Sequence, residues 1–417
     1  SFLCVPLERS EKGMEYFMGV VGLIAEYNPF HNGHKYHIEM SKKVTESDLC
    51  VVVMSGSFTQ SGNIAIYDKF TRAKLATEYG ADLVLELPTI FANSSSRYFA
   101  LGAINLLDKL GIIDSICFGC ESEDITTLKE IVDITEKNED KIWNDIQAYL
   151  KSGISFAVAR QQALSNYLTD KQLENISLPN NILAIEYIKA IRDINSNIQP
   201  YSIKREMSDF NEIILNNNSY NFTSATSIRN SIKSGKLNIL SKYMPPLVYK
   251  TITTKPPLFN DSLFEILKYK IITMTKEELG CIQEVTEGLE NKILEAINIS
   301  KSYEDLIQNI KSKRYQMSKI KRMLNNILLN ITKKDFNYFI DNNLTYAHVI
   351  ACSDNGKELL SKISSNSDID LITSLNENKL ENISENSNRL LKYDVLATNI
   401  HSILNNDKIN KDYTNYL

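Results

Sequence analysis

The 417-residue sequence is poor in three features: clustered cysteines, long apolar runs and excess positive charge. Its six cysteines are scattered, which is typical of a reducing compartment rather than of a disulfide framework. No apolar run approaches the length that spans a bilayer, and the first residues lack the basic and apolar segments of a secretory signal. These absences predict a globular cytoplasmic protein that does not enter a membrane.

The formal net charge of −5 argues against a uniformly basic surface for nucleic acid. One segment departs from this balance, because residues 311–322 carry six cations and no acid. These cations are Lys311, Lys313, Arg314, Lys319, Lys321 and Arg322. We predict that they contact nucleic-acid phosphates and that Tyr315 stacks on an unpaired base, although a solvated helix face would have the same composition.

The chain divides into two kinds of organisation. From about residue 20 to residue 205, short β-branched runs alternate with helical patterns, which is typical of a Rossmann-like, doubly wound parallel α/β sheet. After residue 256 the strand signals fade and the pattern becomes helical. We therefore predict a nucleotide-binding catalytic domain over residues 19–255 and an α-helical region that binds nucleic acid over residues 256–417. The asparagine-rich residues 376–417 predict a weakly packed terminal region.

Three of the five histidines lie within seven residues, in the stretch YNPFHNGHKYH. An apolar strand pattern precedes this stretch and a helical pattern follows it, and phosphates bind at such strand–turn–helix junctions. His31 and His34 would donate hydrogen bonds to phosphate oxygens, and Gly33 would let the backbone approach the ligand. A zinc site is the minority alternative, because the stretch has no H-E-x-x-H pattern. His37, one turn into the helix, is either a ligand-binding or a structural residue.

A second motif, TSATSIRNSIKSG, places several hydroxyl groups before an amphipathic helix. Ser224 and Thr226 could cap that helix, and Arg229 could neutralise a departing pyrophosphate. An ordinary capping box with a surface arginine is the alternative. The position after the last predicted strand favours the second half of a nucleotide-transfer site.

Together, HNGH and TSATSIR resemble the HIGH superfamily of nucleotidylyltransferases and class I aminoacyl-tRNA synthetases. The run GLIAEYNPFHNGHKYH, followed in order by MSGSFTQSG, DKFTRAK, GADLVLELP, CFGCES, LPNNILAIEY, IKRE and SATSIR, is similar to the bacterial tRNA(Met) cytidine acetate ligase family. The resemblance implies that acetate attacks the α-phosphate of ATP to give acetyl-adenylate and pyrophosphate. We expect Mg²⁺ to accompany the ATP, because ATP chemistry generally requires it. The acetyl group would then pass to the wobble cytidine of elongator tRNA(Met) and give N(4)-acetylcytidine. Whether the protein forms a homo-oligomer stays open.

Carried over by position, the resemblance implies an ATP site with His31, His34 and Arg229 in catalytic roles. The ATP-binding residues would be Ile24, Glu26, Asn28, Pro29, Phe30, His31, Gly33, His34, His37, Gly119, Asn180, Asn181, Lys204, Arg205, Ser224 and Thr226. We expect no metal ligands among them. In DKFTRAK, Lys69, Arg72 and Lys74 are further candidates for phosphate or tRNA contact, with an exposed helix face as the alternative.

One departure from the family pattern is Ser61, which stands where the family usually has an arginine. The departure keeps a catalytically silent RNA-binding homologue open as an interpretation. A small-molecule adenylyltransferase of the same superfamily is the other alternative, although such a substrate needs no basic helical region.

Overall fold

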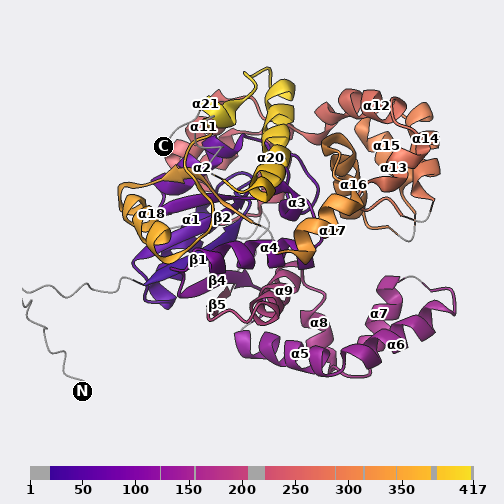
Figure 1. Ribbon diagram of the computed structural model, residues 1–417, viewed down its shortest axis with the longest axis horizontal. Helices are drawn as coiled ribbons and strands as arrows, with labels where there is room; N and C mark the ends of the chain where they lie inside the picture. Colours follow the sequence, from indigo (N-terminus) through magenta and orange to yellow (C-terminus); the bar gives the residue numbers. More distant parts are fainter. Residues whose placement is uncertain are drawn as a thin grey trace, which may run out of the picture.

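A seven-stranded sheet organises the chain (Figure 1). The computed structural model describes residues 19–122, 124–154, 156–204, 221–286, 288–312, 315–343, 345–376 and 383–414. Within these residues the strands are β1 (Val20–Ala25), β2 (Leu49–Ser55), β3 (Leu83–Leu87), β4 (Ser115–Cys120), β5 (Gln199–Lys204), β6 (Ala347–Cys352) and β7 (Leu371–Ile372). Their order is β5-β4-β1-β2-β3-β6-β7, and every neighbouring pair is parallel except β3 and β6.

The central strands β1, β2 and β3 have the sequences VVGLIA, LCVVVMS and LVLEL, and nearly all of their residues are buried. Such continuous apolar runs are expected where helices cover both faces of a parallel sheet. Each of the five runs predicted as strands before residue 205 forms a strand, so the predicted α/β fold is confirmed.

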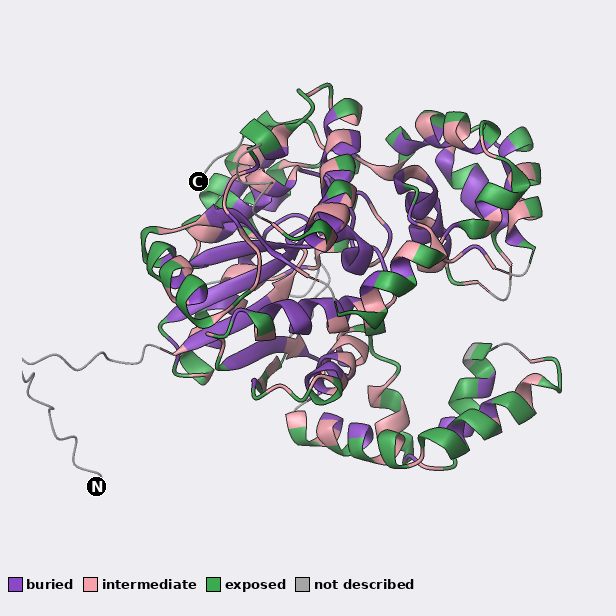
Figure 2. Ribbon diagram, viewed as in Figure 1, coloured by how far each residue is buried: buried purple, intermediate pink, exposed green. Residues whose placement is uncertain are grey.

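Helices cover both faces of the sheet, and Figure 2 shows the strands buried between them. Helices α1 (Asn32–Val44) and α2 (Lys69–Glu78) pack on one face, and α4 (Ser96–Lys109) and α9 (Pro179–Asp193) on the other. The other helices before residue 264 are α3 (Thr89–Ala92), α5 (Ile125–Lys137), α6 (Glu139–Leu150), α7 (Phe156–Leu164), α8 (Asp170–Asn175), α10 (Ala225–Lys233) and α11 (Pro246–Thr254), with the 3-10 helices η1 (Asn238–Lys242) and η2 (Asn260–Leu263). None of the described helices has the length and apolar character needed to cross a membrane.

The region after residue 256 is mainly helical, as predicted. Its helices are α12 (Phe264–Ile272), α13 (Lys276–Cys281), α14 (Leu289–Ile299), α15 (Tyr303–Ile310), α16 (Met317–Leu329), α17 (Lys333–Asp341), α18 (Asp354–Asn366), α20 (Glu385–Leu404) and α21 (Lys411–Thr414). Helices α12 to α16 form a lobe beside the sheet (Figure 1). The chain then returns and adds β6 and β7 to the sheet, so the sheet crosses the boundary predicted at residue 256. Strand β6 was not predicted, because AHVIAC is a short apolar run among helical patterns.

The prediction of a weakly packed region over residues 376–417 is wrong for most of the part that the structure describes. Helix α20 packs against α3 and buries Leu390 and Ala397. Asp412 of α21 is also buried. This terminal segment therefore completes the core of the sheet domain.

Candidate active site

A pocket of about 530 Å³ opens at the carboxyl ends of β1, β4 and β5. Ile24, Gly119 and Lys204 line it from the ends of these three strands. The chain runs outward from β1 through β2 in one direction and continues through β4 and β5 in the other, so the pocket lies where the strand order reverses. Open parallel sheets bind their ligands at this point, and the volume suits a nucleotide-sized molecule.

The turn between β1 and α1 arranges two stacked imidazoles at the pocket. His31 caps α1, and its Nδ1 accepts a hydrogen bond from Gly33 N at 3.0 Å, while His34 Nδ1 accepts from His31 N at 3.3 Å. The ring centroids of His31 and His34 are 3.7 Å apart. Because each Nδ1 is an acceptor, each neutral ring carries its proton on Nε2, the atom suited to donate to an anionic oxygen. A Cβ atom at Gly33 would lie 2.9 Å from His31 Cε1, so the capping ring itself requires glycine there.

Helix α10 brings the second predicted motif to the same pocket. Ser224 Oγ accepts from Ser227 N at 3.1 Å and caps the helix. Arg229 Nη1 donates to Asn28 O at 2.8 Å, across 201 residues of sequence, and Nη2 donates to Thr226 Oγ1 at 2.9 Å. These bonds hold the guanidinium at the pocket beside the histidine turn.

One carboxyl group, that of Glu26, lines the pocket within the described residues. Its Oε1 accepts from Gln60 N at 2.9 Å, and its backbone oxygen accepts from Arg72 Nη1 at 2.6 Å. Burial raises the pKa of Glu26, and the hydrogen bond from Gln60 and the charges of Arg229 and Arg72 oppose that rise. Burial also lowers the pKa of Arg229, against the effect of Glu26.

The opposite wall is apolar and was missed by sequence reasoning. Phe99 from α4, Phe118 from β4, Tyr187 from α9 and Ile203 from β5 line it. Flat aromatic side chains of this kind are suited to pack against a base. Their sequence pattern is that of ordinary core residues, so only the fold identifies them. Gln60, in the loop after β2, also lines the pocket and was not predicted to do so.

Most of the predicted ATP-binding residues line this pocket together. They are Ile24, Glu26, Asn28, His31, Gly33, His34, His37, Gly119, Asn180, Lys204 and Ser224, with Arg229 beside them. Ser61, the departure from the family pattern, lines it too, and its Oγ accepts from Asn63 Nδ2 at 2.8 Å. The two motifs that the sequence linked are therefore parts of one cavity.

Four of the predicted residues do not line the pocket. Pro29 and Phe30 are buried and do not line the pocket. Asn181 is fully buried and does not line the pocket, and its Oδ1 accepts from the backbone N–H groups of residues 121 and 122. Thr226 does not line the pocket, and its Oγ1 accepts from Arg229 Nη2. Direct ATP contact is thus not supported for these four, and Arg205 lies outside the described residues.

The predicted phosphate contact of Arg322 needs correction. Arg322 is buried, and its Nη2 donates to Glu284 Oε1 at 2.9 Å. Its Nη1 donates to Gln60 O at 3.3 Å, which connects α16 to the loop after β2, here called the pocket loop. Half-buried Lys321 reaches the same loop, because its Nζ donates to Asn63 Oδ1 at 2.9 Å. Both side chains therefore join the helical lobe to the pocket.

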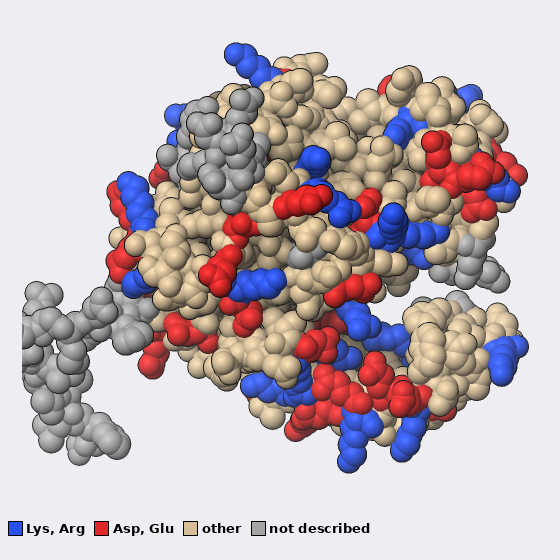
Figure 3. Space-filling view, viewed as in Figure 1, with Lys and Arg blue, Asp and Glu red and all other residues tan. Residues whose placement is uncertain are grey.

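The rest of the predicted basic segment is more open. Lys311 is exposed, and Lys319 Nζ lies 4.8 Å from the ring centroid of Tyr315. Lys313 and Arg314 lie outside the described residues. On the face that Figure 3 shows, Lys and Arg side chains are interspersed with Asp and Glu. The prediction of tRNA contact thus rests on Lys311 and Lys319.

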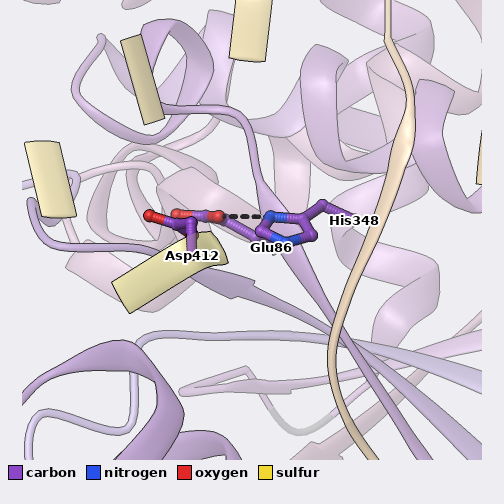
Figure 4. Close-up of side chains that lie close together, drawn as sticks. All are labelled: Glu86, His348 and Asp412. Atoms are coloured by element: carbon purple, nitrogen blue, oxygen red, sulfur yellow. Dashed lines mark hydrogen bonds and ion pairs between the residues drawn. The ribbon is translucent and has the colours of Figure 1, made fainter. Parts of the chain in front are cut away.

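A second cluster of titratable groups lies in the core, where Glu86, His348 and Asp412 bring potential metal ligands within 4.8 Å of one another (Figure 4). Glu86 Oε2 lies 2.9 Å from His348 Nδ1. Lys69 Nζ lies 2.5 Å from Glu86 Oε2 and 2.6 Å from Asp412 Oδ1. An ammonium group therefore already fills the cationic position between these two carboxylates. Lys69 and Arg72 are both buried, so neither the predicted phosphate contact nor the exposed-face alternative holds for them.

The sheet, the pocket at its switch point and the paired motifs define a HIGH nucleotidyl transferase, and the HIGH Nucleotidyl Transferase family model matches residues 18–415. More narrowly, the chain belongs to the tRNA(Met) cytidine acetate ligase family. It is 39% identical over 406 residues to a Clostridium perfringens tRNA(Met) cytidine acetate ligase, covering 95% of this chain and 98% of that protein. It is 40% identical over 411 residues to one from Clostridium botulinum, covering 95% and 97%. A crystal structure of Thermotoga maritima TmcAL bound with alpha-thio ATP has a TM-score of 0.85 and 29% identity, covering 93% of this chain and 95% of that chain.

Proposed function

We propose that this protein is an ATP-dependent acetate ligase that acetylates the wobble cytidine of elongator tRNA(Met) in the cytosol. The observation that carries the proposal is that the His31–His34 turn and Arg229 line the same pocket. The curated relatives and the ATP-analogue complex of the Thermotoga maritima protein support it.

In the first step, acetate attacks the α-phosphate of ATP. The base would lie against the apolar wall, and the phosphates would face the N-terminus of α1, where helix N–H groups favour anions. His31 and His34 would donate from Nε2 to the phosphate oxygens as their charge grows, and Arg229 would stabilise the departing pyrophosphate. Because Glu26 is the one carboxylate among the described lining residues, Mg²⁺ would be held mainly by the triphosphate.

In the second step, the acetyl group passes to the exocyclic amine of the cytidine. The anticodon loop is single-stranded, so its base can turn into a protein pocket without melting a duplex. Lys311 and Lys319, on the lobe that packs against the pocket loop, would contact the tRNA backbone.

The test supplies the full chain with ATP, Mg²⁺, radiolabelled acetate and elongator tRNA(Met), and follows label into acetyl-adenylate and into digested nucleosides. Label in acetylcytidine is the expected result and would make Ser61 a tolerated variation. Label in acetyl-adenylate alone would contradict the tRNA substrate. Label in neither would favour a silent RNA-binding protein, and an unacylated adenylate product formed with another phosphorylated acceptor would favour the small-molecule adenylyltransferase.

A further inference from the structure

Glu26 lines the same pocket as Arg229 and the His31–His34 turn, and its carboxyl group interacts electrostatically with Arg229. We propose that Glu26 is the general base of acetyl transfer, and that it accepts the proton of the cytidine amine as this amine attacks the acetyl carbonyl. The inference rests on the proposed function and assigns a residue to its second step.

The position of Glu26 is fixed from two sides. Its Oε1 accepts from Gln60 N at 2.9 Å, and its backbone oxygen accepts from Arg72 Nη1 at 2.6 Å. Oε2 makes no hydrogen bond within the described residues, so it is the oxygen left for proton transfer. A base must be held within hydrogen-bond reach of the proton that it removes, and these two anchors supply that restraint.

The two capping histidines are unsuited to this role. His31 Nδ1 already accepts from Gly33 N, and His34 Nδ1 already accepts from His31 N. Their Nε2 atoms carry protons in this tautomer, so neither ring offers a basic nitrogen. The cations Lys204 and Arg229 that also line the pocket are donors, not bases.

The two steps differ in their need for a base. Acetate attacks ATP as an anion, so no proton moves in the first step. In the second step the amine nitrogen forms a bond to the acetyl carbon, and the bond from that carbon to the phosphate oxygen breaks. AMP leaves with the electron pair, and one amine proton passes to Glu26 Oε2. The amine of cytosine is a weak nucleophile because its lone pair is conjugated with the ring, so removing the proton assists the attack.

The groups that face Glu26 shape its basicity. They are Arg72 from α2, Arg229 from α10 and Tyr187 from α9, together with the Gln60 N–H. Burial raises the pKa of the carboxyl group, which makes the carboxylate a better proton acceptor than an exposed one. The two guanidinium groups keep the ionised form accessible.

The test separates the two steps in Glu26→Gln. Acetate-dependent exchange between ATP and pyrophosphate reports the first step, and single-turnover transfer from enzyme-bound acetyl-adenylate to elongator tRNA(Met) reports the second. We expect transfer to fall about 100-fold or more. Exchange should fall far less, because Glu26 serves that step only as one of the residues that line the ATP pocket. Glu186→Gln is the control, because burial also raises the pKa of Glu186 but its carboxyl group lines a separate pocket. Both steps should keep their wild-type rates in this control.

The pH profile gives a second readout. Wild-type transfer should rise with pH through the pKa of Glu26, and the rise should be lost in Glu26→Gln, whereas Glu26→Asp should keep it at a lower rate. Equal losses in both steps, or an altered Mg²⁺ requirement for exchange, would overturn the inference and make Glu26 an ATP or metal contact. If the wild type forms acetyl-adenylate but transfers nothing to tRNA, the proposed function fails instead.

Discussion

Helix α2 carries two buried cations, Lys69 and Arg72, whose side chains contact different groups. Arg72 donates to backbone oxygens around the nucleotide pocket, including that of Glu26. Lys69, one turn earlier, lies between the carboxylates of Glu86 and Asp412 in the core. The groups around Arg72 border the nucleotide pocket, whereas the cluster of Lys69, Glu86 and Asp412 is buried among other described protein groups.

The difference teaches which charged clusters bind ligands. In the pocket, Arg229 and Lys204 outnumber the one carboxylate, Glu26, so the site favours an anion. In the core, the ammonium group of Lys69 lies against the carboxylates of Glu86 and Asp412, and His348 Nδ1 lies 2.9 Å from Glu86 Oε2. Burial would raise the pKa of Glu86, but Lys69 and His348 hold it at about 2. The core cluster resembles a metal site in composition only, because its cation is part of the chain.

The largest expected effect is on the free energy of unfolding when the cation of the core cluster, Lys69, is removed. Lys69→Met leaves Glu86 and Asp412 buried without their cation, and breaking a buried pair in this way costs roughly 3–5 kcal/mol of the free energy of unfolding. Chemical denaturation measures the loss. Lys357→Met removes the exposed partner of Asp354 and should leave the unfolding curve unchanged.

Asp412→Asn keeps the shape of the side chain and removes one charge, so it provides a milder variant if Lys69→Met does not fold. Added Mn²⁺ or Zn²⁺ should not raise the stability of the wild type, because Lys69 occupies the cationic position. A rise in melting temperature that depends on the concentration of either metal would contradict this account of the cluster.

In the nucleotide pocket, His34→Ala should lower the rate of the first step. Loss of one donor to the developing charge on phosphate costs about 100- to 1000-fold in acetyl-adenylate formation. Binding of tRNA should stay close to that of the wild type, because His34 lies in the nucleotide pocket. Exchange of pyrophosphate and filter binding of tRNA measure the two effects. A parallel loss of tRNA affinity would show that the variant disturbs more than the site.

A smaller effect concerns how the free energy of unfolding depends on pH through Asp394, a buried carboxyl group on which the charges of Glu86 and Lys69 act. Burial, together with the charge of Glu86, raises the pKa of Asp394 to about 8. The folded protein therefore holds a proton that the unfolded chain, with an ordinary pKa of about 4, has released. Stability from this group is complete below about pH 4 and falls as the pH rises toward 8, by at most about 1.4 kcal/mol per pH unit.

Asp394→Asn should remove this decline. Denaturation at several pH values between 5 and 8 compares the variant with the wild type, and the gap between their unfolding free energies should change steadily across that range. Parallel curves would mean that Asp394 ionises normally in the folded protein. Thr89 N and Tyr346 Oη donate to its carboxyl group, so the backbone bond from Thr89 should survive the substitution.

The pocket residues that were predicted from the sequence are those that belong to local motifs. His31, Gly33 and His34 follow from the order of strand, turn and helix, and Arg229 follows a capping motif. Prediction failed where a partner is distant, because charge in a sequence does not reveal burial. Lys69 meets Asp412 from the opposite end of the chain. The apolar wall of the pocket likewise arises from packing of helices and strands that no local motif links.

The smallest predicted effect separates two cations of α16. Lys319 is partly exposed, whereas Arg322 is buried and forms an ion pair with Glu284. Contact with tRNA should therefore depend on Lys319. Lys319→Ala should lower tRNA affinity a few-fold and reduce the slope of log affinity against log salt by about 0.7–0.9, the amount expected for one phosphate contact. Lys357→Ala, an exposed change on α18, controls for net charge. Since a general loss of positive charge would act equally in both variants, an equal slope for the two would remove Lys319 from the tRNA surface and leave the lobe a structural role beside the pocket loop.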